Sequence, residues 1–302
     1  MDLIVTEGIE KRFGQLTALR DISLRVRRGE LYGLIGPDGA GKTTFFRILT
    51  TLMPPDGGRA TVDGLDIATD YRRIRAAVGY MPGRFSLYPD LTVKENLEFF
   101  ATLFGTRLED NYDLIRDIYV QIEPFRNRRA GRLSGGMKQK LALCCALIHR
   151  PRVLFLDEPT TGVDVVSRHE FWDMLSGLKR QGITMLVSTP YMDEAVRCDR
   201  IALIQSGRLL SIDTPRGIIE NYPDALFEVR AENMRQLTDE IRKRCSPQSC
   251  FAFGRSLHVS FSRNDAEAPQ RMRAALTAAG CTNLEIAPIT PSIEDCFIQQ
   301  MR

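Results

Sequence analysis

The sequence predicts an α/β protein followed by a small C-terminal α+β domain. In the first two-thirds of its 302 residues, short apolar runs of strand length alternate with segments of helical periodicity, which is typical of α/β folds. One of these runs leads directly into a glycine-rich turn and a helix. Beyond about Pro215 the chain instead shows a single β-α-β-α-β order over some 80 residues.

The expected strands of the larger domain are short, apolar and bounded by turn residues. The strand at 31–35 runs into the glycine-rich turn, and a helix is expected from about residue 42 to residue 52. Further strands are expected at 153–156, 183–188 and 201–204. Two segments of helical periodicity, 92–100 and 111–122, follow each other without a strand between them. We therefore expect a helical insertion at about 83–150.

The domain boundary is expected at Asn221-Tyr222-Pro223-Asp224, a run of turn-forming residues. It divides the chain into residues 1–222 and an accessory domain of residues 223–302. Strands of the accessory domain are expected at 227–230, 256–261 and 283–286, and helices at 234–244 and 269–279.

Composition and charge limit the partners and the cellular location that the sequence allows. With 41 Lys and Arg against 38 Asp and Glu, the net charge of +3 is near balance and argues neither for nor against nucleic acid. We expect no nucleic-acid partner. No run reaches the ~18 apolar residues of a membrane helix, and the N-terminus lacks the pattern of a signal peptide. The seven scattered cysteines favour reduced thiols. A cytoplasmic location is therefore predicted.

The glycine-rich turn fits the P-loop pattern of two glycines four residues apart, followed by Lys and Thr. Glycines allow backbone N–H groups to converge on phosphate oxygens, and the helix that follows points its positive end at the same anion. Lys42 is expected to reach the β- and γ-phosphates of ATP, and the Thr43 hydroxyl to ligate Mg²⁺. The predicted nucleotide-binding residues of this turn are Gly36, Asp38, Gly39, Ala40, Gly41, Lys42, Thr43 and Thr44.

A second anchor is the apolar strand that ends in Asp157 and Glu158. Asp157 at the strand end is expected to hold the Mg²⁺ shell. Glu158 is the candidate catalytic residue, placed to polarise an attacking water. The combination with a P-loop makes a merely solvated strand end a poor alternative.

The sequence Leu133-Ser134-Gly135-Gly136-Met137 is similar to the signature motif of ABC ATPases. In that family Ser134, Gly135 and Gly136 would bind the γ-phosphate held by an opposing subunit. The order of motifs over residues 3–222 agrees with the family, and Asp164 falls in its dimer-interface loop. Phe13 stands where the family stacks an aromatic ring on adenine, with a core aromatic as the alternative.

The resemblance implies an ATP-binding and hydrolysing subunit that powers a separate transmembrane permease. It also implies a dimer with a second ABC ATPase subunit, identical or different, and a peripheral position on the inner face of the membrane. Residues 291–297, Pro-Ser-Ile-Glu-Asp-Cys-Phe, resemble the ending of exporter-type ATPases of the drug-resistance group. Export is therefore the expected direction, whereas the sequence is silent on the substrate.

Two positions depart from the family pattern. Gly83 replaces the usual Gln after Met81-Pro82, and Pro190 replaces the usual His after Ser188-Thr189. Proline offers neither a proton nor a side-chain hydrogen bond. One hypothesis is an asymmetric assembly in which this chain's own site hydrolyses slowly; the other is a homodimer in which Glu158 suffices, with Arg84 substituting in part.

Two other functions remain as alternatives. An ATP-binding regulatory module with little or no turnover would also explain Gly83 and Pro190. A soluble, non-transport ABC protein is less compatible, because this chain has one P-loop and no heptad repeat. The permease is expected to contact residues 84–89, through Phe85 and Tyr88. His149 is expected to end a helix, where a cation suits the dipole.

Overall fold

The computed structural model describes residues 1–83 and 87–301. Within them the chain forms two compact units, Met1–Pro215 and Arg216–Arg302. None of the helices in these residues has the length and apolar character needed to span a bilayer. The first unit carries the glycine-rich turn, the signature turn and the Asp157-Glu158 strand end, and the second unit carries residues 291–297.

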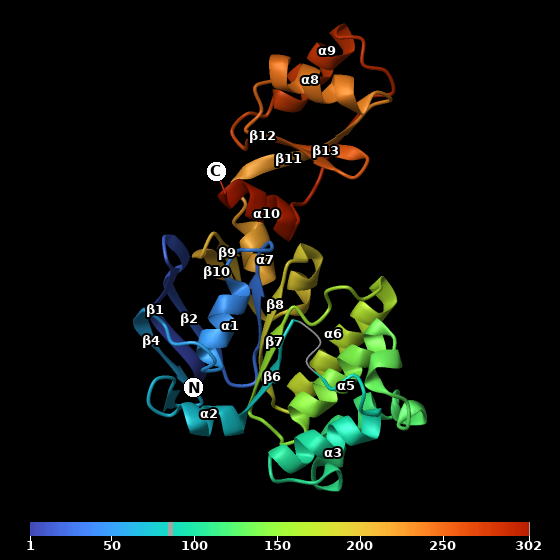
Figure 1. Cartoon of the computed structure of the whole chain (residues 1–302). Helices are drawn as coiled ribbons and strands as arrows, with labels where there is room; N and C mark the ends of the chain where they lie inside the picture. Colours follow the sequence, from blue (N-terminus) through green and yellow to red (C-terminus); the bar gives the residue numbers. More distant parts are fainter. Residues whose placement is uncertain (84–86, 302) are drawn as a thin grey trace. The chain divides into compact units, whose positions relative to one another are not determined.

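The centre of the first unit is a six-stranded sheet in the order β10-β9-β3-β8-β7-β6 (Figure 1). The strands from β9 to β6 are parallel, and β10 returns antiparallel after the turn at 206–207. The central strands are buried along their whole length, as expected for a parallel sheet covered on both faces. Their bounds are β3 Leu31–Ile35, β6 Val78–Met81, β7 Val153–Asp157, β8 Thr184–Thr189, β9 Arg200–Gln205 and β10 Arg208–Asp213.

A second, antiparallel sheet was not predicted from the sequence. It has the order β2-β1-β4-β5, with bounds β1 Asp2–Phe13, β2 Leu16–Arg27, β4 Gly57–Val62 and β5 Leu65–Asp66. Helix α1 (Lys42–Leu49) buries Phe45 and Phe46 in one core cluster that contains side chains of both sheets. The Phe46 ring packs edge-on against Phe155 of β7, with 6.0 Å between ring centroids. The antiparallel sheet thus fixes α1 against the parallel one.

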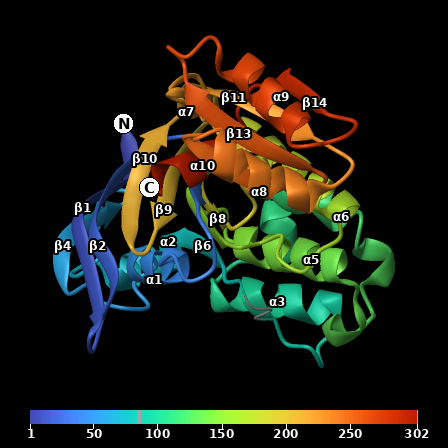
Figure 2. The same cartoon turned by 90° about the horizontal axis from the view of Figure 1, so that it is seen from above.

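Helices α3, α5 and α6 lie on one side of the parallel sheet, and α1 and α2 (Tyr71–Ala77) on the other (Figure 2). Both α3 and α4 pack against α5. Their bounds are α3 Val93–Leu103, α4 Tyr112–Tyr119, α5 Gly135–Leu147 and α6 Val165–Arg180. Short 3₁₀ turns lie at Leu108–Asn111, Glu123–Phe125, Ala130–Arg132 and Met192–Arg197. The predicted helical insertion is therefore confirmed.

The second unit has a four-stranded antiparallel sheet in the order β12-β13-β11-β14. Its element order is β-α-β-β-α-β, which is the ferredoxin-like arrangement, with one strand more than predicted. The unpredicted strand is β12, which pairs with β13 in a hairpin. The bounds are β11 Asp224–Arg230, α8 Met234–Arg244, β12 Ser249–Phe253, β13 Ser256–Ser262, α9 Ala268–Ala278, β14 Glu285–Pro288 and a final α10 Ile293–Gln300.

The division between the units falls seven residues before the expected position, after residue 215 rather than 222. The short helix α7 (Pro215–Glu220) and the buried Tyr222 explain the difference. The Cys296 thiol of α10 donates to the Ile218 carbonyl, which joins α7 to the second unit. Within the described residues all seven cysteines are free; Cys245 and Cys281 of the second unit are half-buried and the other five are buried.

Candidate functional site

The glycine-rich turn connects the carboxyl end of β3 to the first residue of α1. A Cβ atom on Gly36 would lie 2.2 Å from the Ile204 carbonyl oxygen, and one on Gly41 would lie 2.7 Å from the Ala18 oxygen. Gly41 also has a φ of 106°, which only glycine adopts without strain. Packing against β2 and β9 therefore requires glycine at these two positions.

The turn opens onto a cavity of about 420 Å³. The cavity brings together most of the predicted residues of the glycine-rich turn and the predicted catalytic carboxylate. Phe13 lies on its wall with 46% of its surface exposed, so it is not a core aromatic. The lining residues are Phe13, Leu16, Thr17, Ala18, Arg20, Gly39, Gly41, Lys42, Thr43, Thr44, Glu158 and Ser206. Four predicted residues are close in sequence to lining residues but do not line the cavity: Gly36, Asp38, Ala40 and Asp157.

Lys42 is a buried cation with three oxygen partners. Its ammonium donates to the carbonyl oxygens of Gly36 at 2.7 Å and Pro37 at 2.9 Å. It also lies 3.0 Å from Glu158 Oε1. Only 3% of Lys42 is exposed, and a buried charge of this kind is stable only when it is paired and hydrogen-bonded. An anion that enters the cavity would compete with Glu158 for this ammonium group.

Asp157 ends β7 as a buried carboxylate. Ser188 Oγ donates to Asp157 Oδ1 at 2.7 Å, and the Thr43 side chain also hydrogen-bonds this carboxyl. Burial raises the pKa of Asp157, although the bonds from Ser188 and Thr43 oppose the rise. The paired hydroxyl and carboxylate are hard oxygen donors, which fit Mg²⁺. That ion takes one or two protein ligands beside phosphate and water oxygens.

Glu158 adopts a left-handed backbone conformation with a φ of 50°. Its amide N–H donates to the Ser188 carbonyl at 3.1 Å and to Ser188 Oγ at 3.0 Å. Ser188 therefore orients both acidic residues. It bonds the side chain of Asp157 and the backbone amide of Glu158. Ser188 was not among the predicted site residues, and its position near the end of the neighbouring strand β8 is the signal that would have identified it.

The signature turn lies apart from this cavity. Ser134 caps α5, because its Oγ accepts a bond from the Met137 amide. A Cβ on Gly136 would lie 2.8 Å from Ser167 Oγ, so the turn packs against the start of α6. Ser134, Gly135 and Gly136 are absent from the cavity lining. The structure thus does not bring them to this chain's own phosphate cradle.

The two departures from the family pattern lie on either side of β7. Gly83 follows β6, and a Cβ atom there would lie 3.0 Å from the Asp157 carbonyl oxygen. Pro190 follows β8 directly. Neither offers a side-chain donor. Arg84 and Phe85, which were expected to compensate or to bind the permease, lie outside the described residues.

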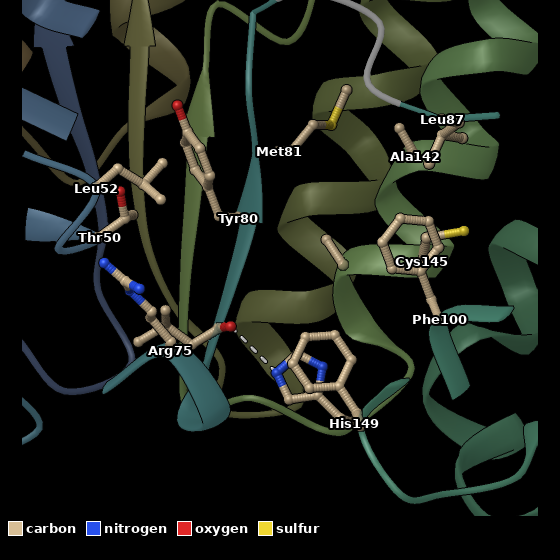
Figure 3. A pocket seen from close by; sticks show the side chains of 13 residues that line it. Thr50, Leu52, Arg75, Tyr80, Met81, Leu87, Phe100, Ala142, Cys145 and His149 are labelled. Carbon is tan, nitrogen blue, oxygen red and sulfur yellow. Dashed lines mark hydrogen bonds between the residues drawn. The ribbon is translucent and has the colours of Figure 1, made fainter. Parts of the chain in front are cut away.

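A second cavity, of about 160 Å³, lies between β6 and the helices α3 and α5 (Figure 3). His149 lies at its wall, stacked on Phe104 with 3.8 Å between ring centroids, and its Nε2 is 3.1 Å from the Val78 oxygen. Burial lowers the pKa of His149 and favours the neutral ring, so the expected cation at a helix end is wrong. The lining is Thr50, Leu52, Arg75, Val78, Tyr80, Met81, Leu87, Phe100, Phe104, Ala142, Cys145, Ala146 and His149.

Comparison with known proteins agrees with this geometry. A family model described as ABC transporter matches residues 19–161. The probable multidrug ABC transporter ATP-binding protein YbhF of Escherichia coli K12 is 38% identical over 98% of this chain and 52% of its own length, so this chain spans about half of that relative. Nod factor export ATP-binding protein I of Burkholderia lata is 36% identical over 97% of this chain and 94% of that protein.

Solved structures give the same result. A structure described as the ATP binding subunit of an ABC transporter is 26% identical and superimposes with a TM-score of 0.66 over 73% of this chain and 93% of that one. The dimeric MJ0796 cassette, a bacterial ABC transporter cassette, is 25% identical with a TM-score of 0.63 over 70% of this chain and 98% of that one. The same cassette has been solved bound to ADP and Pi after hydrolysis.

Proposed function

Since this chain belongs to the ABC transporter family of ATP-binding proteins, we propose that it hydrolyses MgATP to drive export through a separate membrane-spanning partner. The observation that supports this most directly is the meeting of Lys42, Thr43 and Glu158 in one cavity, with Asp157 hydrogen-bonded to Thr43. Oriented phosphate contacts and a nearby carboxylate are what phosphoryl transfer to water requires.

In this proposal the chain binds ATP through the amides of the glycine-rich turn and the Lys42 ammonium. The adenine base of ATP would lie toward Phe13, on the β1–β2 side of the same cavity. Thr43 and Asp157 would hold Mg²⁺, which when bound neutralises charge on the β- and γ-phosphates. Glu158 would release Lys42, accept a hydrogen bond from the attacking water and orient it.

A second ATPase subunit would complete the assembly. The signature turn of Ser134 lies away from this chain's own cavity, so it is available to a nucleotide bound by a partner. Gly83 and Pro190 supply no side-chain contact to the chain's own site, which favours slow hydrolysis. Both an asymmetric heterodimer and a homodimer are compatible with this arrangement, and the rate of the isolated chain distinguishes them.

The membrane partner would dock on the helical side, near the cavity of Figure 3. Tyr88 and Phe99 stand beside each other there, 4.7 Å apart between ring centroids, and each has more than a third of its surface exposed. Exposed aromatic side chains are common anchors of protein interfaces. Docking there would place the chain on the inner face of the membrane.

The names of the relatives do not identify the substrate that this chain's transporter would carry. The name of YbhF says multidrug and that of the Burkholderia lata relative says Nod factor export, so the two names point to different cargo. We propose export as the direction and leave the cargo class open, because the membrane partner selects it.

The decisive experiment measures ATP turnover and ATP binding by the purified chain with Mg²⁺, beside Glu158→Gln. We expect Glu158→Gln to abolish turnover and to retain binding. Glu170→Gln is the matched control, since Glu170 lies on α6 and pairs with Lys140 away from the cavity. Binding without turnover in the wild type, both alone and with its partners, would instead support a regulatory ATP-binding module.

A further inference from the structure

A buried carboxylate lies behind the candidate site and does not line its cavity. Glu194 belongs to the turn Met192–Arg197 after β8 and is 4% exposed. Thr160 Oγ1 donates to Glu194 at 2.8 Å and Thr189 Oγ1 donates at 2.5 Å. Arg168 Nε of α6 donates at 3.1 Å. Three segments of the first unit therefore meet at one carboxyl group.

The buried polar side chains of this network hydrogen-bond to one another. Thr160 and Thr189 are at most 1% exposed, so their hydroxyl groups depend on Glu194 for an acceptor. Arg168 balances the charge of Glu194, and its guanidinium stacks at 4.0 Å over the Tyr191 ring. A fully satisfied buried network of this kind orders the segments that it joins.

These contacts bracket the candidate catalytic residue. Thr160 lies two residues after Glu158, and Thr189 follows Ser188, which accepts the Glu158 amide. The loop is thus tied to the end of β8 on both sides of Glu158. A non-glycine residue with a φ of 50° is strained and persists only where the surroundings hold it.

The network also holds the segment around Pro190. The Tyr191 amide donates to Thr189 Oγ1 at 3.1 Å, so the hydroxyl that binds Glu194 also fixes the residue after proline. Pro190 adds a restricted φ of its own. The end of β8 is therefore fixed by backbone geometry and Glu194, with no side chain of residue 190 needed.

We propose that Glu194 is a positioning residue for ATP hydrolysis: through Thr160 and Thr189 it holds the backbone of Glu158 in the conformation that aims the carboxylate. This inference rests on the proposed hydrolytic function. It differs from a purely structural role, in which Glu194 only neutralises Arg168 and stabilises the fold.

The test uses the full chain and compares kcat with KM for ATP. In Glu194→Ala we expect kcat to fall about 10- to 100-fold, the scale of a misplaced catalytic group, while KM and ATP binding stay near wild type. Glu194→Gln keeps the shape and one acceptor oxygen, so it should recover most of the rate. Thr160→Val removes one hydroxyl without changing the side-chain volume. It should lower kcat and leave KM for ATP unchanged.

Asp193→Ala is the matched control. Asp193 also pairs with Arg168, at 3.1 Å, but its side chain is 76% exposed and no bond joins it to Thr160 or Thr189 among the described contacts. It should leave kcat unchanged. The inference is overturned if Asp193→Ala lowers kcat as much as Glu194→Ala, or if Thr160→Val leaves kcat unchanged. Should Glu194→Ala fail to fold, Thr160→Val and Glu194→Gln decide.

A second readout does not depend on turnover. Hydrogen exchange of the amides in residues 157–163 should become faster in Glu194→Ala and Thr160→Val, while exchange in residues 36–44 stays unchanged. Unchanged exchange in 157–163 would overturn the inference. Absence of turnover in the wild type, with this exchange difference present, would instead contradict the proposed function and leave the positioning of Glu158 intact.

Discussion

Four neighbouring strand ends meet at the candidate site, and they divide into two kinds. The turn after β3 leads to Lys42, and the end of β7 carries Asp157 and Glu158; each of these residues is bonded to a defined partner. The ends of β6 and β8 carry Gly83 and Pro190, which present no polar side chain. In the sheet β8 lies between β3 and β7, so the two kinds alternate across the site.

This difference between the strand ends separates nucleotide affinity from the rate of hydrolysis. In the proposed function, phosphate and Mg²⁺ would be bound by groups that follow β3 and β7, namely Lys42, Thr43 and Asp157. The rate would depend also on residues that follow β6 and β8, where Gly83 and Pro190 offer no side-chain hydrogen bond to the water or the γ-phosphate. The site should therefore bind nucleotide well and turn it over slowly.

The largest effect is expected on the β3 side. Lys42→Ala removes a buried ammonium that would contact the phosphates, so ATP affinity should fall at least about 100-fold, or ~2.7 kcal/mol. Titration calorimetry measures this directly. Lys140→Ala, which removes an α5 cation paired with Glu170, is the control. Equal affinity in Lys42→Ala and wild type would show that the cradle is not a phosphate site.

The next effect tests the β8 side. Pro190→His restores the side chain that the family usually has, and we expect kcat to rise roughly tenfold or more, since one transition-state hydrogen bond contributes ~10² in rate. Pro190→Ala releases the backbone without adding an imidazole and should not accelerate turnover. A rate unchanged by histidine would mean that residue 190 does not limit hydrolysis.

A smaller effect is expected at the end of β6. The Cβ of Gly83→Ala would approach the Asp157 carbonyl to 3.0 Å, so we expect a loss of about 1 kcal/mol from overpacking. Thermal unfolding measures it. Gly177→Ala in α6 is the control, because its Cβ would meet nothing closer than 3.8 Å, and a helix interior favours alanine. Equal melting temperatures for Gly83→Ala and wild type would contradict this close contact.

The smallest effect concerns pH. Burial holds the pKa of His149 below its unfolded value of about 6.5, so the unfolded chain binds more protons and stability should fall as pH drops through that value. Urea unfolding at pH 7.5 and 5.5 measures the loss. His149→Phe, which retains an aromatic partner for Phe104, should lose less stability on acidification. An identical pH dependence in both proteins would argue against a neutral, buried His149.

The sequence predicted the parts of the site that are encoded locally. The strand at 31–35 and the start of α1 at Lys42 each follow from a few adjacent residues. Asp157 and Glu158 were found because they directly follow an apolar run. In these cases the chemistry and the backbone geometry lie within a single motif.

The remaining parts depend on contacts between distant segments. Ser188 and Glu194 act on residues 30 and 34 positions away, and a single sequence does not reveal such pairs. The antiparallel sheet was missed although β2 alternates buried and exposed residues over 22–27, which is the sequence signal of a half-buried strand. Its pairing with β1 and the pairing of β1 with the distant β4 are not encoded in one local motif. Strand β12 was missed because its pairing with β13 is set by a short hairpin rather than by clear alternation.

The distribution of the free thiols allows the two units to be followed separately in solution. Cys245 and Cys281 are the half-buried cysteines of the described chain, and both lie in the second unit. Burial raises the pKa of each thiol, so maleimide dyes should attach slowly and mainly there, at mildly alkaline pH. Replacing either residue with serine would leave one fluorophore on the accessory unit, whose anisotropy during ATP cycling would show whether that unit moves.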